Sequence, residues 1–381
     1  MVYLSKVLIF KNNYTSTIMK FLLKYTKSNL IEAKNDIKYL DLLSENKNKI
    51  DDISKDWNKI KKKIHDYEFI YTSPNRRKNI SSIIPISRSY FKLKEIVKDY
   101  SIPLDNTFVL CMAEAPGGFI QEILENKHII KIYANTLKND DVSVPKWNLK
   151  LSNNKKIDFY YGIKGDGNLV DIDNILSYIK YIGRGTINLV TGDGGFDYSE
   201  DYNKQEYNSV PLIYSEIFLA LNVLKKGGDF ICKIFDSFLK NTIQLIYLLT
   251  ISFDKVYIHK PKCSRLSNSE KYLVCIGYKG YNKDIINELF RNYETKILST
   301  KIDSNFYLKI QEFISQYINI QIDQINKGID IIHSNQTINT PTNDQIKIAK
   351  EWCLKYGIEI NENCYYINGQ SEQVDFKMGV E

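Results

Sequence analysis

The stretch INLVTGDGGFDYSEDYNKQEYNSVPLIYSEIFLALNVLKKGGDFICKIFDS, residues 187–237, decides the fold of this chain. Residues 187–190 and 230–235 are short apolar runs, which predict two strands. Between them, residues 210–224 place apolar side chains at helical spacing, and the glycine pair Gly227-Gly228 follows as a helix stop. The segment therefore predicts a strand, helix, strand unit of an α/β sheet.

Two charged residues of this unit lie where a ligand is expected. Asp193 follows the first strand, and ligands of open α/β sheets bind beyond the carboxyl ends of the strands. Lys233 lies inside the second strand. A central parallel strand is buried on both faces, so an ammonium group there must be paired or must face the site. We therefore expect both side chains to belong to a functional site.

Further apolar runs predict the other strands of the sheet and a helix before the first of them. The expected strands are residues 108–112, 129–134, 158–163, 253–258 and 272–277, and the expected helix is 87–96. Glu270 directly precedes the last strand. If that strand runs antiparallel to its neighbours, Glu270 lies at the same edge of the sheet as Asp193 and Lys233.

A glycine-containing loop, Ala113-Glu114-Ala115-Pro116-Gly117-Gly118-Phe119, follows the first core strand. A glycine pair lets the backbone approach a ligand closely and directs helix N-terminal N–H groups at it. The loop has neither the G-x-G-x-x-G of dinucleotide folds nor the Gly-Lys-Ser/Thr of phosphate loops. It is therefore typical of a nucleoside-like cofactor site, with a plain tight turn as the alternative.

Two polar residues follow the next strands. Asp166 is an acid just beyond residues 158–163. Asn135, after residues 129–134, stands where a carboxylate often binds ribose hydroxyls, and an amide there hydrogen-bonds without the strength of a charge. Both therefore lie at the sheet edge where a ligand is expected.

Length and composition are those of a soluble globular protein. The 381 residues, 43% hydrophobic and 25% charged, can hold one α/β domain of about 200 residues with extensions. No window approaches about 18 uninterrupted apolar residues, so we expect no membrane association and an intracellular location, cytoplasmic with the nucleus as the alternative. The six cysteines form no C-x-x-C pair, which argues against a disulfide framework, and no metal site is expected.

Positive charge is concentrated near the N-terminus. Residues 1–80 hold 17 Lys and Arg against 9 Asp and Glu, whereas the other 301 residues hold 35 against 36. The run Lys61-Lys62-Lys63 can contact nucleic-acid phosphates or can be a solvated helix face, and an Asn, Ile, Lys and Tyr-rich composition accounts for the charge equally well. We expect helices at residues 16–30, 31–43, 51–67, 307–325 and 344–356, with a polar linker at 335–343.

Five ordered motifs resemble one family. SRSYFKLKEI, AEAPGGF, GDGGFD, GGDFICKIFDSF and KPKCSRLSNSEKYLVCIG resemble the FtsJ-like ribose 2′-O-methyltransferases over about residues 81–280, most closely the eukaryotic and viral cap-specific mRNA members. The resemblance implies a Rossmann-like α/β methyltransferase fold. Its sheet is mostly parallel and seven-stranded, with an antiparallel last strand and helices on both faces. The chain would then divide into a basic, mostly helical extension (1–80), the methyltransferase domain (81–285) and a mostly helical C-terminal extension (286–381).

The resemblance also implies roles for single residues. The catalytic tetrad of the family matches Lys92, Asp193, Lys233 and Glu270. Its cofactor contacts match Ala113 to Phe119, Asp166 and Asp193, while Asn135 replaces the ribose-binding acid and Cys111 replaces an acidic residue of the first strand. For RNA contacts we expect Lys61, Lys62, Lys63 and Arg88. If the chain is viral, a virus factory or virion is the expected location.

The implied reaction uses S-adenosylmethionine and needs no metal. A ribose 2′-OH loses its proton as it attacks the methyl group, and a lysine can accept that proton if its pKa falls. We expect burial beside Lys92 to lower the pKa of Lys233, and Asp193 and Glu270 to raise it. The expected product is a 2′-O-methyl group on the first transcribed nucleotide of capped mRNA (cap 0 to cap 1), with other capping or transcription proteins as partners. The alternatives are ribosomal or transfer RNA as substrate, and a catalytically silent RNA-binding or scaffold subunit.

Overall fold

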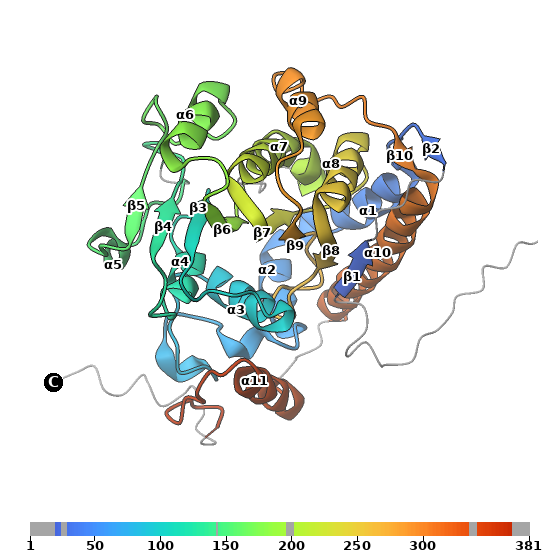
Figure 1. The fold of residues 1–381 in the computed structure, drawn as a ribbon. Coiled ribbons are helices and arrows are strands. Elements are labelled where there is room, and N and C mark those ends of the chain that lie inside the picture. The colour runs from blue at the N-terminus through green and yellow to red at the C-terminus, as the bar shows by residue number, and fades with distance from the viewer. Residues whose placement is uncertain (1–19, 24–28, 142–143, 196–201, 335–340, 368–381) are drawn as a thin grey trace, which may run out of the picture.

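An eight-stranded sheet forms the centre of the computed structural model, which describes residues 20–23, 29–141, 144–195, 202–334 and 341–367 (Figure 1). The strand order is β1-β8-β9-β7-β6-β3-β4-β5. The strands are β1 (Lys20–Leu23), β3 (Phe108–Met112), β4 (Lys131–Ala134), β5 (Ile157–Phe159), β6 (Ile187–Gly192), β7 (Leu224–Ile234), β8 (Phe253–His259) and β9 (Lys271–Tyr278).

Helices cover both faces of the sheet, and a short strand pair lies apart from it (Figure 1). The helices are α1 (Ile37–Asn48), α2 (Ser54–Lys63), α3 (Ser89–Tyr100), α4 (Gly118–Ile123), α5 (Leu149–Ser152), α6 (Ile172–Ile182), α7 (Gln205–Val223), α8 (Lys240–Ser252), α9 (Lys283–Arg291), α10 (Ser304–His333) and α11 (Asn343–Lys355). The separate pair is β2 (Leu30–Ile31) with β10 (Ile302–Asp303), and a 3-10 turn, η2 (Glu68–Ile70), precedes α3. Among the described helices, none has the length and apolar character needed to cross a bilayer.

Strand directions agree with the predicted fold class. β3, β4, β5, β6 and β7 run parallel to one another, and β9 is antiparallel to both β7 and β8. The mostly parallel sheet and its antiparallel last strand are therefore confirmed. The predicted number of seven strands is wrong, because β1 of the N-terminal segment adds an eighth strand antiparallel to β8.

Successive side chains along each strand face opposite sides of the sheet, where two separate apolar cores lie. On β3, Leu110 and Met112 face the larger core beneath α6, α7, α8 and α10, whereas Val109 and Cys111 face the core beneath α3 and α4. Successive side chains of a strand point to opposite faces, so a strand with helices on both sides is apolar throughout. For this reason, unbroken apolar runs located the core strands in the sequence. Two bounds were wrong: β5 ends at Phe159 and not at residue 163, and β7 begins at Leu224, so that the Gly227-Gly228 pair lies in a strand and does not stop a helix.

The predicted helix over residues 16–30 is wrong where the structure describes it. Residues 20–23 form β1, with Leu23 buried at 2% exposure and Leu22 exposed at 39%. A short apolar run does not distinguish a helix from a strand, and the free edge of β8 supplies hydrogen-bond partners for a strand. Residues 16–19 and 24–28 lie outside the described part. The helix predicted for 31–43 begins only at Ile37, because Ile31 belongs to β2, and the helix predicted for 51–67 corresponds to α2.

The N-terminal and C-terminal segments pack on each other. Trp57 of α2 lies against Gly328 of α10, where a Cβ atom would clash with the indole ring. Gln345 of α11 donates a hydrogen bond to the Lys63 main-chain oxygen at 2.8 Å. The predicted C-terminal helices correspond to α10 and α11, and most of the predicted linker, residues 335–340, lies outside the described part. The division into three domains stays a prediction.

Candidate active site

Four charged side chains from four elements meet at the carboxyl edge of the sheet. Asp193 directly follows β6, Lys233 is the penultimate residue of β7, Glu270 directly precedes β9, and Lys92 lies near the start of α3. The structure arranges them as two ion pairs. Lys92 Nζ lies 2.8 Å from Glu270 Oε2, and Lys233 Nζ lies 3.3 Å from Asp193 Oδ1. Lys233 also donates a hydrogen bond of 2.7 Å to the main-chain oxygen of Asp193.

All four side chains are largely buried yet reach the surface, with exposures between 12% and 16%. Lys233 shares its face of the sheet with Ile231, the face that α3 and α4 cover. Lys92 approaches this face from α3. A Cβ atom at Gly195 would lie 3.1 Å from Lys233 Nζ, a tight contact that would press on the ammonium group.

The carboxylates decide the protonation state of Lys233. Burial alone would lower its pKa, but Asp193 and Glu270 outweigh burial, and the pKa of Lys233 is raised. Burial would raise the pKa of Glu270, but Lys92 and Lys233 lower it to about 2. The sequence predicted these opposing effects without deciding between them, and in the free chain the carboxylates prevail. The site pairs two lysines with two carboxylates.

Tyr272 is a fifth member of this centre that sequence reasoning did not single out. It lies on β9 directly opposite Lys233 and is fully buried. Its hydroxyl donates a hydrogen bond of 2.8 Å to Asp193 Oδ1, the oxygen that also faces Lys233. Its position two residues after Glu270, on the same face of β9 as the site, was the available signal.

The loop before β9 folds on itself to hold Glu270. Lys260, 1% exposed, donates hydrogen bonds to the main-chain oxygens of Glu270 (2.7 Å) and Asn268 (2.9 Å). Ser264 donates a hydrogen bond of 2.9 Å to Glu270 Oε1. Burial lowers the pKa of Lys260 well below its usual range. These residues belong to the motif KPKCSRLSNSE, so the motif builds the loop as well as supplying the glutamate.

The glycine loop between β3 and α4 is tightly packed. A Cβ atom at Gly118 would clash with the hydroxyls of Ser87 and Ser89 and would lie 3.0 Å from the main-chain nitrogen of Tyr90. Gly117 has φ +112°, a conformation that favours glycine. Glu114, 2% exposed, accepts hydrogen bonds from the main-chain nitrogens at the start of α4. Its carboxylate therefore holds the loop to the helix.

Asn135 is placed beneath the site and not in it. Its side chain is fully buried, its oxygen accepts from the Ala113 nitrogen (3.4 Å), and its nitrogen donates to the Gly167 oxygen (3.1 Å) and to the Tyr178 hydroxyl. The carboxamide thus ties the loops after β3 and β5 to α6. The side chain is enclosed by protein, and its predicted contact with a ribose stays a prediction.

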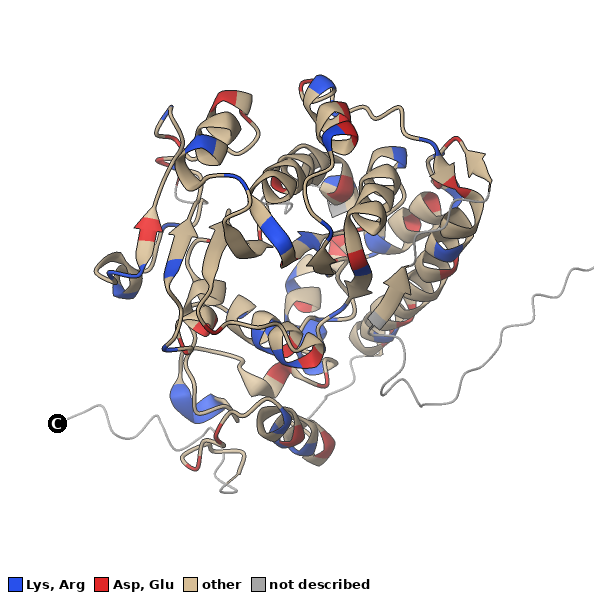
Figure 2. Cartoon of the chain, in the orientation of Figure 1, with Lys and Arg blue, Asp and Glu red and all other residues tan. Residues whose placement is uncertain are grey.

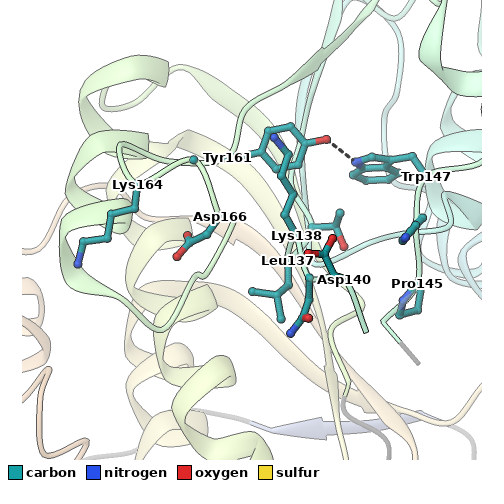
Figure 3. A pocket seen from close by; sticks show the side chains of 12 residues that line it. Leu137, Lys138, Asp140, Pro145, Trp147, Tyr161, Lys164 and Asp166 are labelled. Carbon is teal, nitrogen blue, oxygen red and sulfur yellow. Dashed lines mark hydrogen bonds between the residues drawn. The ribbon is translucent and has the colours of Figure 1, made fainter. Parts of the chain in front are cut away.

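A cavity of about 540 Å³ lies near the glycine loop, and its Trp147 would lie 3.8 Å from a Cβ atom at Gly117 (Figure 3). Residues 113–119 and the four charged side chains of the site do not line it. It is bounded by the segments after β4 and β5. Asp166, predicted from the sequence, lines it together with Asp140, Lys138, Trp147 and Tyr161. Trp147 donates a ring hydrogen bond of 3.1 Å to the Tyr161 hydroxyl, drawn as a dashed line in Figure 3. The lining combines aromatic faces with acidic and basic groups.

The residues predicted for RNA contacts differ in exposure. Lys62 of α2 is exposed and its two neighbours are half-buried, while Lys and Arg are intermixed with Asp and Glu over most elements of the described chain (Figure 2). Burial lowers the pKa of Lys61, and the nearby Arg265 lowers it further. Arg88, 29% exposed, is paired with Glu68 at 3.2 Å and donates to main-chain oxygens of Tyr71 and Cys263. The structure thus gives Arg88 a role within the protein.

Comparisons with known proteins match the central part of the chain. The family model described as FtsJ-like methyltransferase matches residues 85–278. "Cap-specific mRNA (nucleoside-2′-O-)-methyltransferase 1A" of Caenorhabditis briggsae is 32% identical over 189 residues, covering 48% of this chain and 21% of that protein. "Inactive cap-specific mRNA (nucleoside-2′-O-)-methyltransferase 1B" of the same species is also 32% identical over 189 residues, covering 48% and 22%.

Solved structures are similar over a comparable region. "A ribosomal RNA methyltransferase, putative", from Plasmodium falciparum is 24% identical, with a TM-score of 0.39, and covers 51% of this chain and 99% of that one. The chain spans between 20% and 49% of the length of the curated relatives it matches.

Proposed function

Because the chain belongs to the FtsJ-like methyltransferase family, we propose that it methylates the ribose 2′-hydroxyl of the first transcribed nucleotide of capped mRNA. The observation that carries the proposal is the double ion pair of Lys92 with Glu270 and Lys233 with Asp193 at one sheet edge. The names of the relatives support the cap-specific substrate. Because one relative is described as inactive, the proposed activity of this chain rests on the residues of its site and not on similarity.

In this mechanism Lys233 is the base that accepts the proton of the 2′-hydroxyl. Asp193 holds the ammonium form of Lys233 and raises its pKa. A further positive charge bound beside Lys233 would lower that pKa. Lys92 and Glu270 neutralise each other next to it, so a proton can move without leaving a net charge buried. Tyr272 fixes the carboxylate of Asp193 and therefore the direction of the Lys233 amine.

The residues around the cavity fit S-adenosylmethionine, which when bound supplies an electrophilic methyl group on a sulfonium. A volume of about 540 Å³ is in the range of small-molecule sites. Asp140 and Asp166 would accept hydrogen bonds from its nucleoside, and Trp147 and Tyr161 offer aromatic surface. In this proposal Asp140 binds the ribose hydroxyls, the role that the sequence suggested for Asn135. Gly118 keeps the loop close to the first turn of α3, leaving no space for a side chain.

Replacing Tyr272 by Phe is expected to lower kcat about tenfold, because a hydrogen bond to a charged group contributes about 1.5–3 kcal/mol. The ring remains, so the core beneath α3 stays packed. Steady-state kinetics with capped RNA measure the effect. Tyr278→Phe is the matched control, since Tyr278 lies at the far end of β9 and donates to the Leu221 oxygen away from the site. Equal kcat for both variants would contradict the role given to Tyr272.

Replacing Lys61, Lys62 and Lys63 together by Ala is expected to weaken RNA binding similarly for all sequences. Three lost phosphate contacts should reduce the slope of log K against log salt by about two for a single strand. The measurement is a fluorescence anisotropy titration at several salt concentrations. Lys225, Lys226 and Lys283, exposed at the opposite edge of the sheet, form the matched triple control. An unchanged slope would mean that the run is a solvated helix face.

The substrate class is tested by direct competition. Wild-type protein and labelled S-adenosylmethionine are incubated with a short capped RNA, a transfer RNA transcript and a ribosomal RNA fragment in one reaction. The proposal predicts label on the capped RNA, because a single-stranded end can enter a crevice that a duplex interior cannot. Label on the transfer or ribosomal RNA instead would replace the cap assignment by one of these substrates.

A further inference from the structure

The pair of Lys92 and Glu270 joins two elements that no strand pairing connects. Lys92 is carried by α3, and Glu270 ends the loop of residues 260–270. The Nζ to Oε2 distance of 2.8 Å therefore depends on how α3 lies against this loop. An error of about 1 Å in such a placement can cost a hundredfold in rate. Some other contact must hold the helix and the loop together.

Glu68, from the N-terminal segment, makes that contact. Its side chain is 1% exposed. Arg265 of the loop donates two hydrogen bonds to it, from Nε to Oε2 at 3.0 Å and from Nη2 to Oε1 at 2.8 Å. Arg88, directly before α3, donates from Nη1 to Oε1 at 3.2 Å. One buried carboxylate thus binds a residue one helical turn before Lys92 and a residue of the loop that holds Glu270.

Positively charged groups surround this carboxylate. Arg88 also reaches across to the loop, donating from Nη2 to the Cys263 oxygen at 3.4 Å. Burial, together with Arg88 and Arg265, lowers the pKa of the neighbouring His65 well below its usual range. Two guanidinium groups thus face one buried carboxylate here. Without the charge of Glu68, the two guanidinium groups would repel each other in a poorly solvated space, which separates the helix from the loop.

We propose that Glu68 is a positioning residue for the active site, acting through Arg88 and Arg265 to set the Lys92–Glu270 pair. The N-terminal segment is then part of the catalytic scaffold and not a separable RNA-binding arm. This inference rests on the proposed function for its effect on catalysis. Its structural part, the joining of α3 to the 260–270 loop, stands independently.

A second anchor keeps the loop folded when Glu68 is changed. Glu95 of α3 accepts hydrogen bonds from the Lys262 nitrogen at 2.8 Å and from the Trp352 ring nitrogen at 3.0 Å. This anchor holds the start of the loop and involves α11. The variant Glu68→Gln, which keeps the size and removes the charge, is therefore expected to fold and to loosen the loop near Arg265.

The test compares Glu68→Gln with Asp303→Asn in the full chain. Asp303 is a fully buried carboxylate that caps α10, accepting from the nitrogens of Asn305 (2.9 Å) and Phe306 (3.2 Å), outside the 260–270 loop and α3. Hydrogen exchange followed by mass spectrometry reports on the 260–270 loop and α3. Kinetics with capped RNA give kcat and KM, and calorimetry gives the affinity for S-adenosylmethionine.

For Glu68→Gln we expect exchange at least about tenfold faster in the 260–270 loop and α3 only, and kcat lowered about tenfold to a hundredfold with cofactor affinity within twofold of wild type. Asp303→Asn should leave kcat unchanged. Unchanged local exchange, unchanged kcat, or the same losses in both variants would overturn the positioning role. If the wild-type chain transfers no methyl group, the proposed function fails, and the exchange comparison alone decides whether Glu68 joins the two elements.

Discussion

The Lys233→Ala variant is expected to lose methyl transfer by at least about a hundredfold while binding S-adenosylmethionine nearly as well as the wild type. Loss of a general base costs roughly 10²-fold to 10⁴-fold, and Lys233 contacts Asp193 and not the cavity near the glycine loop. Single-turnover rates and calorimetry measure the two effects separately. Retention of more than about a tenth of the wild-type rate would contradict the role of Lys233 as the base.

Two variants sharpen this result. Lys233→Arg keeps the positive charge and removes the ability to lose a proton, because a guanidinium stays protonated in proteins. It should be as inactive as the alanine variant if Lys233 acts as a base, and partly active if only its charge matters. Lys226→Ala, at the exposed start of the same strand, should have wild-type activity.

The pH dependence of the wild type follows from the same residue. Asp193 and Glu270 raise the pKa of Lys233 against the effect of burial, so the neutral amine is the minor form at neutral pH. When S-adenosylmethionine and RNA are both limiting, the rate reports on the free chain. It should therefore rise with pH, about tenfold per unit, until the pKa is reached. A rate that is flat from about pH 6 to 9 would show that the base has another identity.

Gly118→Val is expected to weaken cofactor binding by about fivefold to a hundredfold. A Cβ atom at this position clashes with Ser87 and Ser89 and approaches the Tyr90 nitrogen to 3.0 Å. Because the last of these is backbone, the first turn of α3 or the glycine loop must move, and overpacking of this kind costs about 1–3 kcal/mol. Calorimetric titration with S-adenosylmethionine measures the loss.

Gly185→Asn provides the matched control for a glycine replacement. Gly185 has φ +67°, which Asn tolerates, and a Cβ atom there meets no atom within 4 Å. It should bind the cofactor normally. Normal binding by Gly118→Val as well would place the cofactor away from the glycine loop.

The sheet was predictable because its strands are buried on both faces. Residues 108–112 were predicted as a strand and form β3, Phe108–Met112, since a short unbroken apolar run between turn residues is typical of a strand buried on both sides. β1 was not predictable in the same way. Its short run fits a helix or a strand, and the free edge of β8 that decides between them is contributed by residues far along the chain.

For the site, the sequence indicated residue types and the fold determined their contacts. Asp193 and Lys233 could be placed at one sheet edge because strand ends are readable from the pattern. Glu270 joined them only if the last strand is antiparallel, which the family resemblance implied. The burial of Asn135 could not be predicted, because its partners Gly167 and Tyr178 become its neighbours only in the folded chain. The pairing of Glu68 with Arg265, 197 residues apart, is likewise a product of tertiary packing.

The sign of the pKa shift of Lys233 depended on distances as well as on neighbours. The sequence predicted both the opposing effects, burial that lowers the pKa and carboxylates that raise it. Only the Nζ to Oδ1 distance of 3.3 Å and the proximity of Glu270 show that the carboxylates prevail in the free chain.

Mapping the methylated nucleoside tests cap-specific ribose methylation most directly. Wild-type protein, with Lys233→Ala as the blank, is incubated with labelled S-adenosylmethionine and one RNA sequence, either capped or with a 5′ triphosphate. The RNA is then digested, and the labelled nucleoside is identified. We expect a 2′-O-methyl group on the first transcribed nucleotide of the capped RNA and a much weaker signal from the uncapped RNA. Label on a base, label at an internal ribose, or equal label on both RNAs would contradict the proposed function.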